Sequence, residues 1–279
     1  MLVSILLPTR GRLESLEKSV KSLIDNAIEP EKVEILMRID DDDEVSLSNM
    51  EKIKNLHTHT QVIVGSRHKG YQSLHTFCNE LAEQATGKWL FIWNDDAIMI
   101  SEGWDFTFSD LESEGKAPAL IQVGEKHKYS PESQPLFTTP FPIINKIVYE
   151  KLGHISPSYY NDTYVGLVFI IAEHMSSAYY NLNGRPPKIN LSAYYGNMDW
   201  VANFNITHPH LLTYNAMSEI MVEHQRPDIT GDNNDDTWKQ GVTLARQQEN
   251  SSEHIKSVWP QIIRDALDIT ELYIQGEIR

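Results

Sequence analysis

The sequence contains a single cysteine, Cys78, among 279 residues. One cysteine excludes a disulfide within the chain and favours a reducing compartment, so we expect a cytoplasmic protein in which Cys78 packs in a helix. Long apolar runs are also missing. No stretch approaches the length that spans a bilayer, and residues 1–8 are too short for the apolar region of a signal peptide.

Basic residues are scarce as well. The chain has 24 Lys and Arg against 39 Asp and Glu, which gives a formal net charge of -15. This charge argues against non-specific attraction to nucleic-acid backbones and anionic membranes, because both require a basic surface, and it leaves open a local basic groove. Repeats, low-complexity segments and Pro/Gly/Ser linkers are missing too. The hydrophobic content of 41% is enough for one large core domain, which we expect over residues 1–250, followed by a packing helix over 251–279.

Apolar strand patterns alternate with helical spacing through the first 100 residues. The expected strands are Leu2–Leu7, Val33–Ile39, Gln61–Val64 and Trp89–Trp93, and the expected helices are Leu13–Ile24, Ser48–Leu56 and Tyr71–Gln84. This alternation predicts an α/β fold with a doubly wound, mainly parallel sheet and helices on both faces.

Acidic side chains follow two of these strands directly. Asn94, Asp95 and Asp96 end the most apolar strand, and the run 40–44 of four aspartates and a glutamate ends the second. In an open α/β sheet the carboxyl ends of parallel strands share one edge, where ligands bind. Hard oxygen ligands at such an edge suit Mg²⁺ or Mn²⁺ bridging to phosphate oxygens.

The pattern loosens after residue 96. We expect a helix over Trp104–Leu111, a strand over Leu120–Val123, a segment over Phe137–Ile144, and helices over Lys146–Leu152, Tyr159–Met175 and Ser252–Ile278. Residues 176–250 are rich in Tyr, Asn, Asp, His and Pro, and we expect irregular structure there, lining a site.

These residues carry a family resemblance. The segment 3–10 with Leu16, Ser19 and Leu23, then Ile39-Asp40-Asp41, then Asn79 before Gly87, then Asn94-Asp95-Asp96, resembles the N-terminal half of family-2 glycosyltransferases of the GT-A fold. The resemblance covers residues 2–100 well and 137–210 more loosely. It implies a nucleotide-binding half over 1–100 and an acceptor half over 101–250.

The resemblance also implies a donor site at the sheet edge. The residues implied to hold the nucleotide are Pro8, Thr9, Arg10, Asp40 and Asp42, with Arg67 meeting the diphosphate and Asp95 belonging to the DxD-type motif. That motif binds Mn²⁺ or Mg²⁺ in the family. Here Asn94 takes its first acidic position, so Asp96 is the expected metal ligand, and His208 is the histidine expected to complete the metal shell.

The acceptor side is similar to the family over Phe141–Gly153, which an acidic general base normally follows. The candidates are Asp162 and, second, Asp199. The expected activity is transfer of a hexose from a UDP-sugar to a hydroxyl acceptor, metal-dependent and inverting. Two alternatives stay open: a catalytically silent sugar-nucleotide-binding homologue, which Asn94 and Gly166 favour, and a nucleotidyltransferase, which the lack of a Gly-rich loop after the first strand disfavours.

Overall fold

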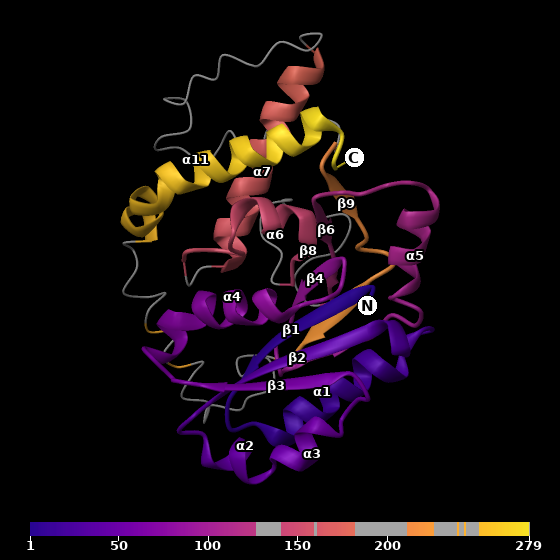
Figure 1. Ribbon diagram of the computed structural model, residues 1–279, viewed down its shortest axis with the longest axis vertical. Helices are drawn as coiled ribbons and strands as arrows, with labels where there is room; N and C mark the ends of the chain where they lie inside the picture. The colour runs from indigo at the N-terminus through magenta and orange to yellow at the C-terminus, as the bar shows by residue number, and fades with distance from the viewer. Residues whose placement is uncertain are drawn as a thin grey trace.

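A computed structural model describes residues 1–126, 141–158, 161–181, 211–225 and 251–278, together with Lys239 and Thr243. Its centre is a seven-stranded sheet of order β3-β2-β1-β4-β8-β6-β9 (Figure 1). The first four strands are β1 (Val3–Thr9), β2 (Val33–Asp40), β3 (Thr60–Gly65) and β4 (Trp89–Ile92). They run parallel, with Val3 beside both Val33 and Trp89. The four expected parallel strands are therefore confirmed.

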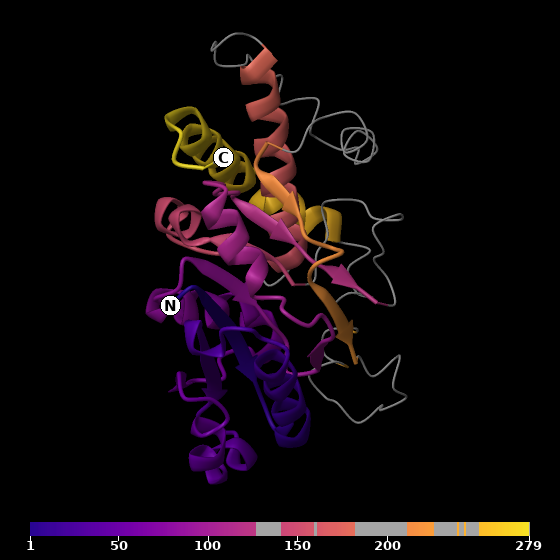
Figure 2. The ribbon, with the colours of Figure 1, turned by 90° about the vertical axis from the view of Figure 1, so that its right-hand side faces the viewer.

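The remaining strands extend this sheet and form a second, smaller one. In the large sheet, β8 (Ile143–Asn145) pairs antiparallel with β4 and β6 (Leu120–Gln122), and β6 pairs parallel with β9 (Thr213–Asn215). In the small sheet, β10 (Met221–His224) lies between β5 (Ala97–Met99) and β7 (Gly124–Glu125). Figure 2 shows β10 beside the lower half of the molecule. The small sheet begins directly after Asp96, so it starts at the edge that carries the acids.

Helices cover both faces of the large sheet. They are α1 (Leu13–Asp25), α2 (Glu44–Ser48), α3 (Met50–Lys54), α4 (Leu74–Gln84), α5 (Phe106–Ser113), α6 (Lys146–Leu152), α7 (Asn161–Asn181) and α11 (Ser251–Gln275), with the short 3₁₀ helices η1 (Pro30–Lys32) and η2 (Gly70–Ser73). In α1 the buried apolar residues Leu16, Val20 and Leu23 recur at helical spacing and face the sheet. No helix within the described ranges is long and apolar enough to cross a bilayer.

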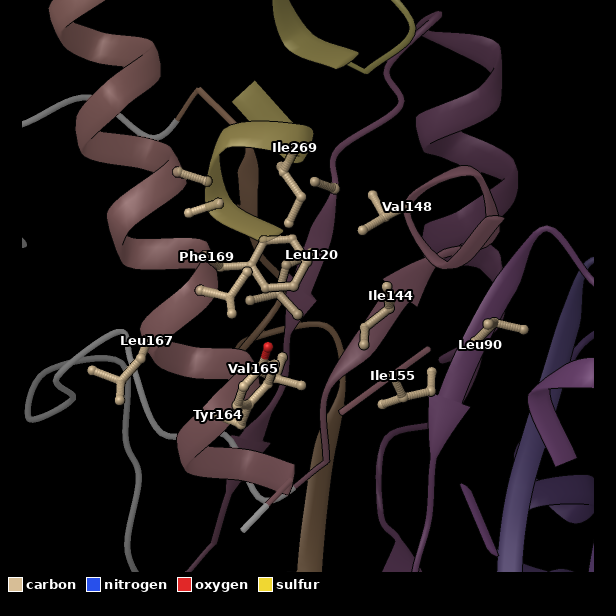
Figure 3. Close-up of a cluster of buried hydrophobic side chains, with 14 of the residues drawn as sticks. Leu90, Leu120, Ile144, Val148, Ile155, Tyr164, Val165, Leu167, Phe169 and Ile269 are labelled. Atoms are coloured by element: carbon tan, nitrogen blue, oxygen red, sulfur yellow. The ribbon is translucent and has the colours of Figure 1, made fainter. Parts of the chain in front are cut away.

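β1, β2 and β4 are buried along almost their whole length, as strands covered on both faces are, whereas the edge strand β3 is partly exposed. Odd-numbered side chains of β1 (Val3, Ile5, Leu7) join a core under α1 and α5, whereas Leu6 joins a second core with α4, α6, α7 and α11. Figure 3 shows this second core, where side chains from α7, α11 and the strands converge around Phe169. The C-terminal helix α11 therefore packs in the same core as the central sheet.

A close contact fixes β4 beside β1. Gly87 lies just before β4 and donates its N–H to Ser4 Oγ at 2.8 Å, while Ser4 donates to the buried Glu34 at 2.5 Å. A Cβ at Gly87 would lie 2.6 Å from that oxygen and 2.7 Å from the Ser4 nitrogen. Only glycine lets the chain enter β4 this close to β1.

Some sequence expectations need correction. The helix expected over Trp104–Leu111 begins at Phe106, since Trp104 lies in a turn and donates its Nε1–H to the Leu23 carbonyl at 2.9 Å. The irregular structure expected over residues 176–250 does not hold for β9 and β10, which are too short for an alternation to stand out in the sequence. The helix expected to end at Met175 continues to Asn181.

Candidate active site

The carboxyl ends of β1, β2 and β4 meet at one edge of the sheet, as parallel neighbours must. Residues 10–12 follow β1, the aspartate run begins at Asp40, the last residue of β2, and Asn94-Asp95-Asp96 comes just after β4. Two arginines after β1 each reach one of these acid groups. Arg10 pairs with the acids of β2, and Arg12 pairs with those of β4. The expected convergence of the acids at one edge is thus present as a bonded network.

Asp95 is the anchor of this network. Its carboxylate accepts a hydrogen bond from Thr9 Oγ1 at 2.6 Å and pairs with the Arg12 guanidinium, while its carbonyl accepts from Ser15 Oγ at 2.8 Å. The side chain is only 3% exposed. Because both carboxylate oxygens are engaged by β1 and its following turn, Asp95 fixes the turn in place.

Asp96 faces the small sheet. Its Oδ2 accepts from Arg12 at 3.1 Å, and its Oδ1 lies 3.1 Å from Nε2 of His224, the last residue of β10. Burial alone would raise the pKa of Asp96, but hydrogen bonding and positive charge from His224 and Arg12 outweigh it and lower that pKa. Asp96 is therefore an ionised carboxylate beside an imidazole.

His224 is held from three sides. Ala97 of β5 pairs opposite it in the small sheet, its ring meets that of Phe141 edge to face with centroids 5.1 Å apart, and Asn94 Nδ2 lies 3.4 Å from its Nε2. The short amide side chain in the first motif position thus contacts the histidine. This arrangement aims one ring nitrogen at Asp96 and fixes the distance between the two donors.

The acids after β2 have divided roles. Asp40 is buried and accepts from Arg10 at 3.0 Å, whereas the exposed Asp42 pairs with the same guanidinium. Burial would lower the pKa of Arg10, but hydrogen bonds to Asp42 and Asp40 raise it. The hydrogen bond from Arg10 lowers the pKa of Asp42, with a further contribution from the charge of Arg67. Arg10 and Arg67 therefore keep the exposed carboxylate ionised.

Asp43 serves the fold. Its side chain accepts from the backbone N–H of Ser46 at 3.2 Å as the N-cap of α2, and from the N–H of Gly11 at 2.8 Å. Gly11 has a φ of 66°, a left-handed conformation that glycine adopts without strain. The cap thus ties the turn after β1 to the turn after β2.

Arg38 supports Asp40 from beneath. This arginine is 1% exposed on β2, pairs with Asp40 and bonds the Ser66 carbonyl and Glu80, and its guanidinium carbon lies 4.0 Å from the centre of the Phe77 ring. A buried guanidinium with this many partners holds a carboxylate in one orientation. The side chain of Asp40 is therefore positioned by two arginines.

The other residues expected at the site lie outside the network of acids and arginines described above, or outside the described residues. Pro8 is half-buried in β1, and Arg67 follows β3, close enough to influence Asp42. Asp162 lies in the first turn of α7, half-exposed, with Oδ1 accepting from the Thr163 N–H at 2.8 Å. Asp199 and His208 lie outside the described residues.

Sequence reasoning missed Arg12 and His224. Arg12 lies two residues after Arg10, in the short turn between the buried strand β1 and α1, and that position was its signal. His224 ends a short run of alternating apolar residues, Ile220 and Val222, which resembles a strand that delivers a polar group. The signal was weak because β10 has only four residues.

The donor set fits a divalent cation shared with a phosphate. No group of three or more His, Cys, Asp or Glu side chains within the described ranges is arranged to hold a metal. Asp96 and His224 supply one oxygen and one nitrogen donor 3.1 Å apart. Mg²⁺ and Mn²⁺ sites that also bind substrate phosphates need only one or two protein ligands. A diphosphate would complete the coordination shell.

The fold and the edge together define an α/β protein of the GT-A type, with paired acids at the carboxyl ends of parallel strands. Residues 4–117 match the family model described as "Glycosyl transferase family 2". The resemblance to family-2 glycosyltransferases of the GT-A fold is therefore confirmed over residues 4–117, which include the acids of this edge.

The structure of a known protein agrees with this fold. The whole chain aligns with 83% of a Staphylococcus aureus TarS 1-349 structure, with a TM-score of 0.55 and 11% identity. Two other structures have a TM-score of 0.49. One is TarS 1-349 in complex with UDP, which is 14% identical over 60% of this chain. The other is the Pyrobaculum calidifontis mannosyltransferase PcManGT in complex with GDP-Man and Mn²⁺, which is 12% identical over 97% of this chain and 86% of its own. The alignment with the UDP complex spans 54% of that protein's chain. No curated protein sequence matches.

Proposed function

We propose that this protein is a metal-dependent, inverting glycosyltransferase that moves a hexose from a UDP-sugar to a hydroxyl acceptor. The observation that carries the proposal is the bonded edge in which Thr9, Arg12, Asp95, Asp96 and His224 meet. The family match over residues 4–117 supports sugar transfer from a nucleotide-sugar donor as the class of reaction. The single cysteine supports a cytoplasmic location.

In this proposal the nucleoside binds between the ends of β1 and β2. The contacting residues are Pro8, Thr9, Arg10, Asp40 and Asp42. Asp40 supports the assignment because two arginines orient its carboxylate while spare lone pairs remain to accept a ring N–H or a ribose hydroxyl. Arg67 approaches the diphosphate from the end of β3.

Asp96 and His224 hold the cation, and His208 remains a further candidate ligand. When bound, the metal neutralises charge on the departing diphosphate. Asp95 orients the edge for this role without being exposed to donor. Its carboxylate fixes both Thr9 and Arg12, so the residues around the diphosphate need no rearrangement as charge develops.

Asp162 takes the proton of the acceptor hydroxyl, with Asp199 as the second candidate base. Asp162 is half-exposed in the first turn of α7, where a helix N-terminus favours a negative charge. The segment before α7 is clamped, because Asn79 of α4 accepts from the Ile155 N–H at 2.8 Å and donates to the Ser156 carbonyl at 3.0 Å. The clamp supports a fixed position for the chain just before α7.

Calorimetric titration of UDP with and without Mn²⁺ tests the donor site. Asp96→Asn is expected to keep the fold and to remove the Mn²⁺-dependent part of UDP affinity, because the amide is a poor ligand for a hard cation. Asp25→Asn, an exposed change at the far end of α1, is the matched control and should bind as the wild type does. Equal affinity in Asp96→Asn and wild type would remove Asp96 from the metal site.

A silent homologue is the second candidate, and Asn94 is the observation that favours it. The amide stands in the first acidic position and contacts His224 at 3.4 Å, so one carboxylate of a DxD motif is replaced. Hydrolysis of a panel of UDP-sugars with Mn²⁺ separates the two functions. Binding without turnover for any donor would favour the silent homologue, and hydrolysis that Asp162→Asn abolishes would favour the transferase with Asp162 as the base.

A further inference from the structure

The positively charged side chain of Arg12 lies between Asp95 and Asp96, the two acids that come just after β4. Its guanidinium pairs with Asp95 and donates to Asp96 Oδ2 at 3.1 Å, and its side chain is 31% exposed. It leaves Asp96 Oδ1 to His224. A metal bound to Asp96 and His224 would therefore lie across one carboxylate from a fixed positive charge.

The charges of this group are the reason to expect an effect on metal binding. With both carboxylates ionised, Asp95, Asp96 and Arg12 together carry one net negative charge. Without Arg12 the same acids would carry two, and a divalent cation would be attracted more strongly. A diphosphate at the edge would return negative charge to the group and restore the attraction.

We propose that Arg12 is an internal counter-ion that suppresses metal binding in the absence of nucleotide and so couples metal loading to donor binding. The inference rests on the proposed metal and donor site and adds a mode of regulation to it. The cation then binds tightly only when the diphosphate is present, and the acids stay paired at other times. Arg12 acts here through charge, while Asp96 and His224 supply the ligands.

Titration of Mn²⁺ in the absence of nucleotide, with free Mn²⁺ measured by electron paramagnetic resonance, tests the proposal without an activity assay. Arg12→Gln should bind Mn²⁺ more tightly than wild type, on the order of tenfold to a hundredfold, as expected for one unit charge a few ångströms from a divalent ion near the surface. Arg12→Met is a second neutral variant, to be used if the first does not fold.

Two controls separate charge from other effects. Arg12→Lys retains the charge and should stay within about threefold of wild type. Arg264→Gln removes an exposed arginine of α11, whose guanidinium donates to Gln261 of the same helix. Because this guanidinium lies on a helix of the second core and not in the turns around the acids, the expected change is also within about threefold.

The outcomes distinguish this inference from the proposed function. If wild type binds Mn²⁺ with UDP, but the neutral variants bind Mn²⁺ alone no more tightly than wild type does, the counter-ion role of Arg12 is refuted and the proposed donor site stands. If neither wild type nor the neutral variants bind Mn²⁺ with or without UDP, both fail. The inference is supported if the neutral variants, but not the two controls, bind Mn²⁺ more tightly than wild type in the absence of UDP. UDP should then increase the Mn²⁺ affinity of the neutral variants less than it increases that of wild type.

Discussion

Glu173 makes the stability of this protein depend on pH near neutrality. It is a carboxylate in the apolar helix α7, 5% exposed, and it accepts hydrogen bonds from the backbone N–H groups of Leu211 and Leu212, the latter at 2.9 Å. Thr213 Oγ1 lies 3.4 Å away. Burial raises the pKa of Glu173 to about 7 against these hydrogen bonds, which lower it. The carboxyl group that holds the start of β9 therefore titrates near pH 7.

The sign of the effect follows from proton binding. Between the ordinary pKa of 4.5 and about 7, the folded state holds a proton on Glu173 that the unfolded state has lost. The stabilising contribution is thus complete below about pH 4.5 and is lost as the pH rises to about 7. At about 1.4 kcal/mol per pH unit, the full loss is about 3 kcal/mol.

Urea unfolding of wild type and Glu173→Gln, followed by circular dichroism, measures this loss. We expect the free energy of unfolding of the variant, relative to wild type, to rise by about 2 kcal/mol from about pH 5.5 to about pH 8 and then to level off. Starting above the isoelectric point of 5.1 avoids precipitation. A difference that stays constant with pH, or that falls, would refute the assignment of a raised pKa to Glu173.

Three further changes test the packing of the fold, each by the free energy of unfolding in urea. Gly87→Ala should cost on the order of 2 to 3 kcal/mol, because the new Cβ lies 2.7 Å from a backbone nitrogen of β1; a cost below about 0.5 kcal/mol would show that β4 can move away. Tyr164→Phe should cost about 1 to 3 kcal/mol, since it leaves buried Asp265 without the hydroxyl that donates at 2.5 Å, and no loss would mean that another group replaces that donor. Asp43→Ala should cost about 1 kcal/mol or more through loss of the α2 cap, whereas exposed Asp41→Ala should be neutral; equal costs would contradict the cap.

The nucleotide-binding half could be predicted from the sequence because its signals are local and strong. A strand such as β4, buried along its whole length, has an unbroken apolar run, and α1 has apolar residues at helical spacing. Both patterns are visible without knowledge of partners. Parallel order then follows from the alternation, and with it the arrival of Asp40 and Asp96 at one edge.

The rest of the site depends on contacts that no local pattern encodes. Among the acids, the sequence could not separate Asp43, which caps a helix, from Asp42, which is exposed and paired with Arg10. Glu173 reads as an oddity in an apolar helix until the N–H groups of residues 211 and 212 are brought to it. Such roles are set by segments distant in sequence, so only the folded chain assigns them.

His224 shows why the edge needs the small sheet as well as the large one. Asp96 is followed at once by β5, and β5 pairs with β10 so that Ala97 faces His224. The same backbone pairing that closes this sheet therefore sets the distance between the carboxylate and the imidazole. On the other side of β10, Gly124 has room for no side chain, since a Cβ would lie 2.8 Å from the Met217 carbonyl. The position of the second metal-ligand candidate is thus determined by how closely three short strands pack, and a histidine elsewhere in the chain could not replace it without its own strand to deliver it.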